Sequence, residues 1–323
     1  METLIKCPHC KSNLVSKYGS YSHKRTHKII QRFLCKKCGS TFSDQTNSLL
    51  YKQHRPDLNE KILTAVSSGT GIRKIAFNFH TNKKTVQRKI KFLARICDKF
   101  HKKFMSESHK ELIFQFDELE TCEHSSHSTV MVPVVVERKS HFIVGSIAQY
   151  VPSRSQYPKL KDRHNLKNQA EIEKRDEIVK EQLQLCRTMQ PTGAIVIETD
   201  GHRSYPNYIK EVFKDSGEHI IYTDEEEKKQ RLFPINNIHA CMRADKAMLR
   251  RDTWHVCKDK NFLSNHLKIY IFYSNYMKKK IYSRKYKDEK GRKKKKVIGV
   301  KTPAQQLGIL DHPIHLQFLL NNY

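Results

Sequence analysis

The sequence has few acidic residues for its length and lacks any long apolar run. Its 323 residues include 61 Lys and Arg but only 33 Asp and Glu, for a net charge of +28. Such an excess repels itself, so we expect a polyanionic partner, with nucleic acid first and an anionic membrane second. A membrane span needs roughly 18 apolar residues, and no stretch approaches that length. The first residues lack the apolar core of a signal peptide, so we expect a cytoplasmic, nucleoid-associated protein of a bacterium or archaeon.

The nine cysteines do not indicate disulfides, because a chain of this kind is expected in a reducing compartment. Four of them form two CxxC pairs, Cys7 with Cys10 and Cys35 with Cys38. Each CxxC turn supplies two thiolates, and zinc takes four such soft ligands in a tetrahedron. A segment this short cannot fold around an apolar core alone, so bound metal would supply much of its stability. We predict a structural zinc ribbon over residues 1–48; a redox CxxC would come singly, within a βαβ unit.

Residues 49–105 carry the apolar spacing of three helices. Apolar positions recur on one face from 58 to 66, from 72 to 79 and again after Asn82, which offers an N-cap. Two short helices followed by a basic third one match the helix-turn-helix that enters the major groove of DNA. A small helical bundle with a solvated basic face is the alternative. The predicted DNA-contacting residues of the third helix are Lys83, Lys84, Thr85, Gln87 and Arg88.

Two apolar strands that each end in an aspartate form the centre of the chain. The segment 111–120 reads ELIFQFDELE, and the segment 194–201 reads AIVIETDG. Both apolar runs are too short for a helix and lack helical spacing, so we predict buried strands. Asp117 and Asp200 then stand where the core meets solvent, an arrangement that brings carboxylates from distant sequence to one metal site. A turn or helix-cap role explains a single strand-end aspartate equally well.

The surrounding segment, 106–281, is typical of one α/β domain. Strands, a charged helical stretch and further strands are predicted at 111–117, 130–136, 141–147, 153–190, 194–200 and 219–222. Three strands, a helix and a fourth strand are the order of the ribonuclease H-like fold, in which the first acid lies on the first strand and the second follows the fourth.

The C-terminal segment, 282–323, is expected to be a basic tail. The run 278–296 that leads into it contains twelve Lys or Arg and two acids. Runs of this kind are usually flexible and solvated, and beside DNA-binding modules we expect this one to lie along phosphates.

Taken in order, these segments resemble the small insertion-sequence transposases of the DDE type. The resemblance covers most of the chain, and the order of its parts is what makes it specific. Its motifs are CGSTF at 38–42, FDE at 116–118, TDGH at 199–202, Arg243, RRDTW at 250–254 with Lys258, YIFYSN at 270–275 and KTPA at 301–304.

The resemblance implies a multidomain α/β protein with a ribonuclease H-like catalytic domain built on a mixed sheet. It also implies Mg²⁺-dependent cleavage at transposon ends and strand transfer into target DNA. Two Mg²⁺ ions roughly 3.5–4 Å apart serve the attacking and leaving oxygens of such a displacement. Asp117 would bridge the two ions and Asp200 would hold one of them. Double-stranded DNA is the implied partner, and a homo-oligomer is expected because two transposon ends must be held together.

The third ligand departs from the family pattern. In these enzymes it is usually a glutamate that opens a helix after the second aspartate, and the downstream motifs align Asn236 there, with Asn237 beside it. Asp245 is the nearest carboxylate on the following helix, but nine residues at about 100° each put it on the opposite side. The glutamates at 225–227 have workable spacing in a charged run that we expect to be a solvated loop. We assign Asn236, whose amide oxygen binds Mg²⁺ without adding charge.

The same asparagine supports a second class of function. A catalytically decayed, sequence-specific DNA-binding protein would keep the fold and lose the third acid. An RNA-processing nuclease shares the metal chemistry and is a third interpretation. We predict a DDE transposase that uses structural zinc and catalytic magnesium.

Overall fold

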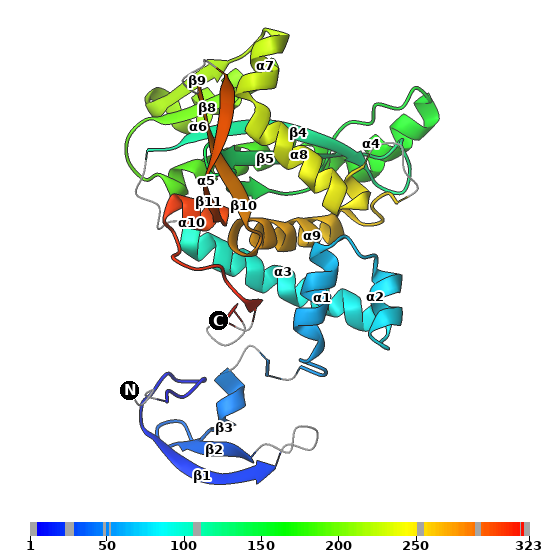
Figure 1. The fold of residues 1–323 in the computed structure, drawn as a ribbon. Helices are drawn as coiled ribbons and strands as arrows, with labels where there is room; N and C mark the ends of the chain where they lie inside the picture. The colour runs from blue at the N-terminus through cyan, green and yellow to red at the C-terminus, as the bar shows by residue number, and fades with distance from the viewer. Residues whose placement is uncertain are drawn as a thin grey trace. The chain divides into compact units, whose positions relative to one another are not determined.

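The computed structural model describes residues 5–22, 29–47, 50–51, 53–105, 111–250, 255–287, 292–316 and 318–319. The chain divides into two compact units, Met1–Leu58 with Leu316–Tyr323, and Asn59–His315. Figure 1 shows the elements of each unit along the chain.

The first unit contains a three-stranded antiparallel sheet. Its elements are β1 (Val15–Ser22), β2 (Ile29–Cys35), β3 (Thr41–Ser43) and the 3₁₀ turn η1 (Asp44–Asn47). The apolar centre is small: the rings of Phe33 and Phe42, 5.6 Å apart, pack beside Cys7 and Cys35. So little apolar burial is typical of a unit whose stability comes largely from a metal.

Three helices follow, and the predicted spacing accounts for all of them. They are α1 (Leu58–Ser67), α2 (Ile72–Asn78) and α3 (Lys83–Met105). The predicted N-cap of α3 is confirmed, because Oδ1 of Asn82 accepts the N–H of Lys84 at 2.8 Å. The end of α3 packs on α9 (Lys260–Phe272), where the ring of Phe100 meets the ring of Phe272 edge-on at 5.4 Å. The helices and the sheet that follows therefore share one packed body.

A mixed sheet forms the centre of the second unit. Its strands lie in the order β6-β5-β4-β8-β9, and β7 also pairs with β5. Strand β4 runs antiparallel to β5 and parallel to β8, which is parallel to β9. The bounds are β4 (Ile113–Cys122), β5 (Thr129–Glu137), β6 (Ile143–Ser146), β7 (Gln149–Tyr150), β8 (Ile195–Thr199) and β9 (Gly217–Ile221). The predicted strands are confirmed, including both that lead to the aspartates.

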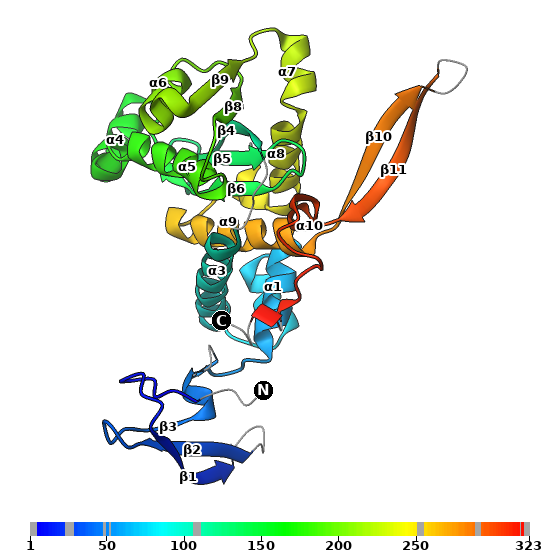
Figure 2. The same cartoon turned by 90° about the vertical axis from the view of Figure 1, so that its left-hand side faces the viewer.

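Helices cover both faces of this sheet (Figure 2). On one face lie α5 (Arg175–Met189) and α6 (Tyr205–Phe213), and on the other α8 (Phe233–Asp245) and α9. The remaining elements are α4 (Pro158–Ile172), α7 (Glu225–Arg231), the 3₁₀ turns η2 (Lys214–Ser216) and η3 (Ala247–Leu249), and the π turn η4 (Tyr273–Met277). Because both faces are covered, the inner strands are continuous apolar runs, and every residue of β5 is buried.

The segment expected to be a flexible tail instead contains regular structure. An antiparallel hairpin is formed by β10 (Lys280–Lys287) and β11 (Lys293–Lys301), and α10 (Pro303–Leu307) follows. Figure 2 shows the hairpin extending away from the rest of its unit. The β-branched residues Ile281, Val297, Ile298 and Val300 favour strands although all four are exposed.

Candidate functional site

The two strand-end aspartates follow neighbouring parallel strands. Strands β4 and β8 pair in parallel as far as Gln115 beside Glu198, and β8 ends at Thr199. Continuing this register by two residues sets Asp117 opposite Asp200, with both side chains on one face because successive residues alternate. Both carboxylates therefore lie at the carboxyl end of the parallel pair, the edge where open α/β sheets bind ligands.

The turn after β8 requires the glycine that the sequence provides. Gly201 has φ +82°, and a Cβ atom there would lie 2.7 Å from Cγ2 of Ile221. Oδ1 of Asp200 accepts the N–H of His202 at 3.2 Å, which fixes the carboxylate at the start of the turn. The TDG order is thus a local requirement of how the strand ends.

The electrostatics of Asp117 show that negative charge accumulates at this edge. Burial first, and the charge of Asp200 second, raise the pKa of Asp117 to about 7. The N–H of Glu118, 2.7 Å from Oδ1 of Asp117, and the guanidinium of Arg243 act in the opposite direction. Hard oxygen donors with uncompensated charge are the ligands that Mg²⁺ prefers, so this donor set fits a divalent cation.

Helix α8 adds polar groups to the same site. Nδ1 of His239 lies 3.5 Å from Oδ2 of Asp117. Burial first, and then the charge of Arg243, lower the pKa of His239 to about 4, so the imidazole is neutral at pH 7. Its Nε2 atom is buried and has no hydrogen-bond partner in the described part of the chain. Helical spacing puts the exposed Asn236 on the same side of α8, one turn before His239.

The other candidates for a third ligand lie elsewhere. The carboxylate of Asp245 forms an ion pair with Lys278 at 3.2 Å, on the side of α8 away from Asn236. Asn237 is half-buried and is turned about 100° from Asn236 around the helix axis. The glutamates at 225–227, expected in a loop, open the exposed helix α7. Among the described residues, none of these three candidates contacts Asp117, whereas His239 does.

One buried side chain connects the three elements that carry the site. Nε2 of Gln115 donates to Oε2 of Glu198 and to the carbonyl of Arg231, each at 2.7 Å. Oε1 of Gln115 accepts the N–H of Ile235 at 3.1 Å. Arg138 neutralises Glu198 through a 2.8 Å ion pair. These bonds fix β4, β8 and the start of α8 relative to one another without any metal.

Tyr205, at the start of α6, closes the site from the opposite face of the sheet. Its ring packs edge-on against Phe116 at 4.8 Å and lies 4.9 Å from the ring of His202. Burial first, and then the charge of Asp117, raise the pKa of Tyr205 above its usual range. Sequence reasoning missed Tyr205 and His239. The signal for His239 was present, since it follows Asn236 by three residues, but no sequence pattern marks Tyr205.

The four predicted zinc ligands converge in the first unit. All four sulfur atoms lie within 4.8 Å of one another. Sγ of Cys7 is 3.7 Å from Sγ of Cys38, and Sγ of Cys10 is 3.5 Å from Sγ of Cys35. A zinc tetrahedron with Zn–S bonds of about 2.3 Å separates its sulfurs by about 3.8 Å. The donor set therefore fits zinc.

The two CxxC turns have the same backbone hydrogen bonds. The first cysteine of each motif donates its N–H to the carbonyl five residues later, Ser12 in one case and Ser40 in the other. Its carbonyl accepts the N–H four residues later, from Lys11 or from Gly39. Both of those residues have positive φ. Hydrogen bonds from Ser40 lower the pKa of Cys38 to about 6. A backbone hydrogen bond from Ser12 lowers the pKa of Cys10, but burial and the neighbouring thiols outweigh it and raise that pKa to about 11, so the thiols of the group do not all favour the thiolate by themselves.

The residues predicted to contact DNA occupy the first two turns of α3. Lys83, Lys84, Gln87 and Arg88 are exposed and Thr85 is half-buried, while Val86 and Ile90 face the core.

Among the described residues, no helix is long and apolar enough to cross a membrane. The 250–254 motif overlaps positions 251–254, which lie outside the described residues.

Comparison with known proteins shows a distant similarity to a protein of a transposable element. No protein-family model matches the chain. Over 98 residues the chain is 32% identical to an uncharacterised protein in the transposable element ISH50 of Halobacterium salinarum. The match covers 29% of this chain and 31% of that protein, so the chain spans less than a third of its relative's length. The four-cysteine group and the mixed α/β fold are thus accompanied by a distant similarity to a protein of an insertion element.

Proposed function

We propose that this chain is an insertion-sequence transposase of the DDE type. The observation that carries the proposal is the register that sets Asp117 opposite Asp200 at the carboxyl end of two parallel strands. The raised pKa of Asp117 and the distant relative in an insertion element support the same conclusion. The proposed domains are a zinc ribbon at 1–48, a helix-turn-helix at 49–105, a ribonuclease H-like catalytic domain at 106–281 and the basic segment 282–323.

The proposed reaction is transfer of a phosphoryl group between oxygen nucleophiles. Asp117, Asp200 and the amide oxygen of Asn236 would hold Mg²⁺, and the bound metal would activate the attacking water or 3′-hydroxyl and stabilise the leaving oxygen. Attack on phosphorus proceeds in line, and the bond to the 3′-oxygen breaks. Arg243 supplies positive charge beside the acids, where the phosphorane-like charge develops. Neutral His239 positions Asp117 from the side of α8.

DNA is the proposed partner, through the first turns of α3 and through the positive charge of the chain. The exposed residues of the first turns of α3 would read the major groove. The chain's charge of +28 would add phosphate contacts that weaken with salt. Because both transposon ends must be cut together, we propose a homo-oligomer that acts on the nucleoid.

The test is Mg²⁺-dependent cleavage of duplex DNA that carries the inverted repeats flanking the gene. Asp117→Asn and Asp200→Asn should each abolish cleavage and leave DNA binding intact, because each removes a metal ligand and not a DNA contact. Asp215→Asn changes an exposed aspartate in η2 and is the matched control. Retained cleavage in either site variant would refute the assigned site.

A second function is favoured by one residue. Asn236 stands where the resembled family has glutamate, and an enzyme without that charge binds Mg²⁺ more weakly. A sequence-specific DNA-binding protein with a decayed catalytic domain would bind the inverted repeats and cleave nothing, in the parent and in Asn236→Glu alike. Competition with RNA of the same sequence distinguishes the transposase and the DNA-binding protein from an RNA-processing nuclease, since RNA should compete well only for the nuclease.

A further inference from the structure

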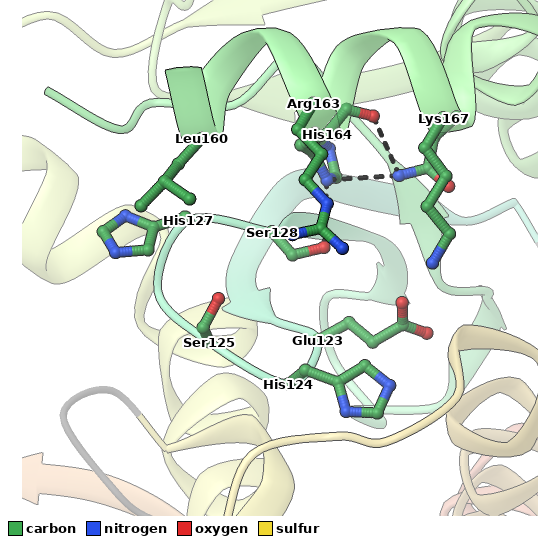
Figure 3. Close-up of a pocket in the computed structure, with 10 residues that line it drawn as sticks. Glu123, His124, Ser125, His127, Ser128, Leu160, Arg163, His164 and Lys167 are labelled. Carbon is green, nitrogen blue, oxygen red and sulfur yellow. Dashed lines mark hydrogen bonds between the residues drawn. The ribbon is translucent and has the colours of Figure 1, made fainter. Parts of the chain in front are cut away.

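A pocket lies in the second unit, beyond the C-terminal end of β4. The turn between β4 and β5 forms one wall and helix α4 forms the other, around a cavity of about 290 Å³. Figure 3 shows Arg163 and Lys167 of α4 extending over the opening, with His124 and Ser125 of the turn facing them. The volume is close to the lower end of the range for small-ligand sites.

The walls of this pocket are fixed by bonds within the protein. Ring nitrogens of His164 contact the hydroxyl of Ser128 at 2.9 Å and the carbonyl of Val151 at 3.0 Å. Glu123 accepts the hydroxyl of Tyr150 at 2.8 Å and the N–H of Lys260 at 2.7 Å. The buried polar groups are therefore satisfied, and the pocket exists before any ligand arrives.

The chemistry of the lining is not that of a metal site. Glu123 is the one acid in the lining, and both of its oxygens are engaged. Within the described ranges, the four cysteines of the first unit are the only group of three or more His, Cys, Asp or Glu side chains close enough to hold a metal. A cation would also meet two positive side chains at the opening.

The side chains of Arg163 and Lys167 are available to bind an anionic ligand. Arg163 and Lys167 are both exposed and lie one helical turn apart on α4. Neither forms an ion pair or hydrogen bond with another residue that the structure describes. A guanidinium fork beside an ammonium is the usual recognition of phosphate in proteins.

One side of the lining suits a flat ring. Leu160 and the imidazole of His127 line one side (Figure 3). Nδ1 of His127 lies 2.9 Å from the Ser155 hydroxyl, and Tyr157 packs edge-on against the imidazole at 5.5 Å. A fixed imidazole beside an apolar side chain is a surface on which an unstacked base can lie. A phosphate on the two basic side chains and a base beside Leu160 and His127 together make up one nucleotide.

The location connects this pocket with the acid pair. Glu123 follows Asp117 by six residues and lies one residue beyond the end of β4, so the two positions are separated by about 20 Å at roughly 3.3 Å per residue. That distance equals about six base pairs of duplex at 3.4 Å each. A DNA strand positioned at the acids can therefore reach the pocket.

We propose that the pocket between α4 and the β4–β5 turn binds an unpaired nucleotide of a DNA strand, with its phosphate on Arg163 and Lys167. The assignment of the bound strand as DNA rests on the proposed transposase function. It adds a site that holds DNA away from the point of cleavage and selects ends that have come apart.

The first test compares two pairs of charge removals in the full chain. Arg163→Gln with Lys167→Gln changes the pocket; Lys161→Gln with Lys174→Gln removes the same charge from exposed positions outside its lining. Binding of a short fluorescent single-stranded oligonucleotide is measured by anisotropy across a salt series. The pocket pair should weaken binding about tenfold more than the control pair and reduce the salt slope by about 0.7, the value for the one phosphate that both side chains contact. Equal losses in the two pairs would overturn the proposal.

The second test blocks the cavity without changing charge. Ser125→Phe places a ring in the opening and should lower single-strand affinity about as much as the charge removal, with duplex binding and melting temperature unchanged. Wild-type affinity in this variant would mean that the strand binds outside the pocket, and this result would refute the proposed nucleotide site. Displacement of the oligonucleotide by micromolar free deoxynucleoside monophosphate would also refute the strand assignment and identify a free nucleotide as the ligand.

These measurements separate the two proposals. Both tests read binding and not cleavage, so loss of single-strand affinity in the pocket variants supports the pocket even if Asp117→Asn cleaves normally. Conversely, unchanged affinity refutes the pocket while Mg²⁺-dependent cleavage keeps the transposase assignment.

Discussion

The two candidate metal sites of this chain are built in opposite ways. The four cysteines come from two four-residue motifs, in a unit whose buried apolar centre has two phenylalanines. Asp117 and Asp200 are 83 positions apart and are brought together by the register of a large sheet. Local backbone turns therefore position the ligands of the first site, whereas the tertiary fold of the whole second unit positions those of the second.

The difference predicts what each metal does for stability. Zinc would build the first site, because the apolar core there is too small to hold the turns together. The second site is already assembled by the hydrogen bonds of Gln115, and the raised pKa of Asp117 shows that its charge opposes folding. Zinc would be a structural component of the first unit, and Mg²⁺ would be a catalytic cofactor of the second.

The largest effect should follow removal of zinc ligands. Cys10→Ser with Cys38→Ser should abolish zinc binding, normally one ion per chain, and unfold β1–β3, because structural zinc contributes roughly 10–16 kcal/mol. The second unit should keep its fold. Metal analysis and amide hydrogen exchange measure both outcomes. Cys241→Ser, a half-buried cysteine outside the group, is the control; protected amides in β1–β3 without zinc would contradict the prediction.

The next effect tests whether the protein itself builds the acid site. Gln115→Leu removes three hydrogen bonds and leaves the N–H of Ile235 and the carbonyl of Arg231 without this partner. We expect a loss of about 2–4 kcal/mol in the free energy of unfolding, measured with urea on the full chain. Gln169→Leu, on the exposed side of α4, should cost less than about 0.5 kcal/mol. Similar losses in both would mean that the Gln115 network does not hold the site.

A smaller effect is expected at the third ligand. Asn236→Glu adds a carboxylate on the side of α8 that carries His239 and should tighten Mg²⁺ binding about tenfold, roughly 1.4 kcal/mol. Asn237→Glu, one residue further around the helix, should leave it unchanged. The Mg²⁺ concentration for half-maximal cleavage, or direct calorimetry, reports the change. Equal effects at the two positions would show that the first turn of α8 does not face the acids.

An effect of similar size concerns stability and pH. The folded-state pKa of Asp117 is raised from 3.8 to about 7, so the folded state binds this proton more tightly and stability falls as pH rises between those values. Above about pH 7 the penalty is complete. Because 28% of the side chain is exposed, solvent screens the effect, and we expect Asp117→Asn to stabilise the metal-free protein by about 1–2 kcal/mol at pH 8.

The same variant should lose its advantage in two conditions. As pH falls towards about 4, the wild-type carboxyl is protonated in the folded state as well, and the melting temperatures should converge. Added Mg²⁺ should stabilise the wild type alone. A constant difference across this range would show that the stabilisation has another cause.

Local patterns predicted most of the elements. Apolar runs of five or six residues predicted β4 and β8, and Asn82 predicted the start of α3. The zinc ligands were predictable because each CxxC turn places two of the four sulfur atoms close together. The motif is local, so a single sequence is enough to recognise it.

Residues whose role depends on tertiary contacts could not be predicted. His239 becomes part of the site only because α8 packs on the face of β4 that carries Asp117. Tyr205 reaches it from the other face. The hairpin β10–β11 was missed because its lysines dominate the composition, while the strand-forming pattern lies in four β-branched residues.

The parallel ladder between β4 and β8 also restricts how such a chain can vary in length. A side chain alternates faces with every residue, so gain or loss of one residue inside 195–200 would swing the second aspartate behind the sheet. The stretch from 151 to 190, which contains α4 and α5, carries no such constraint on its loops. Insertions and deletions tolerated by active copies should therefore concentrate in that crossover connection, where the chain can lengthen or shorten while the distance between the acids stays the same.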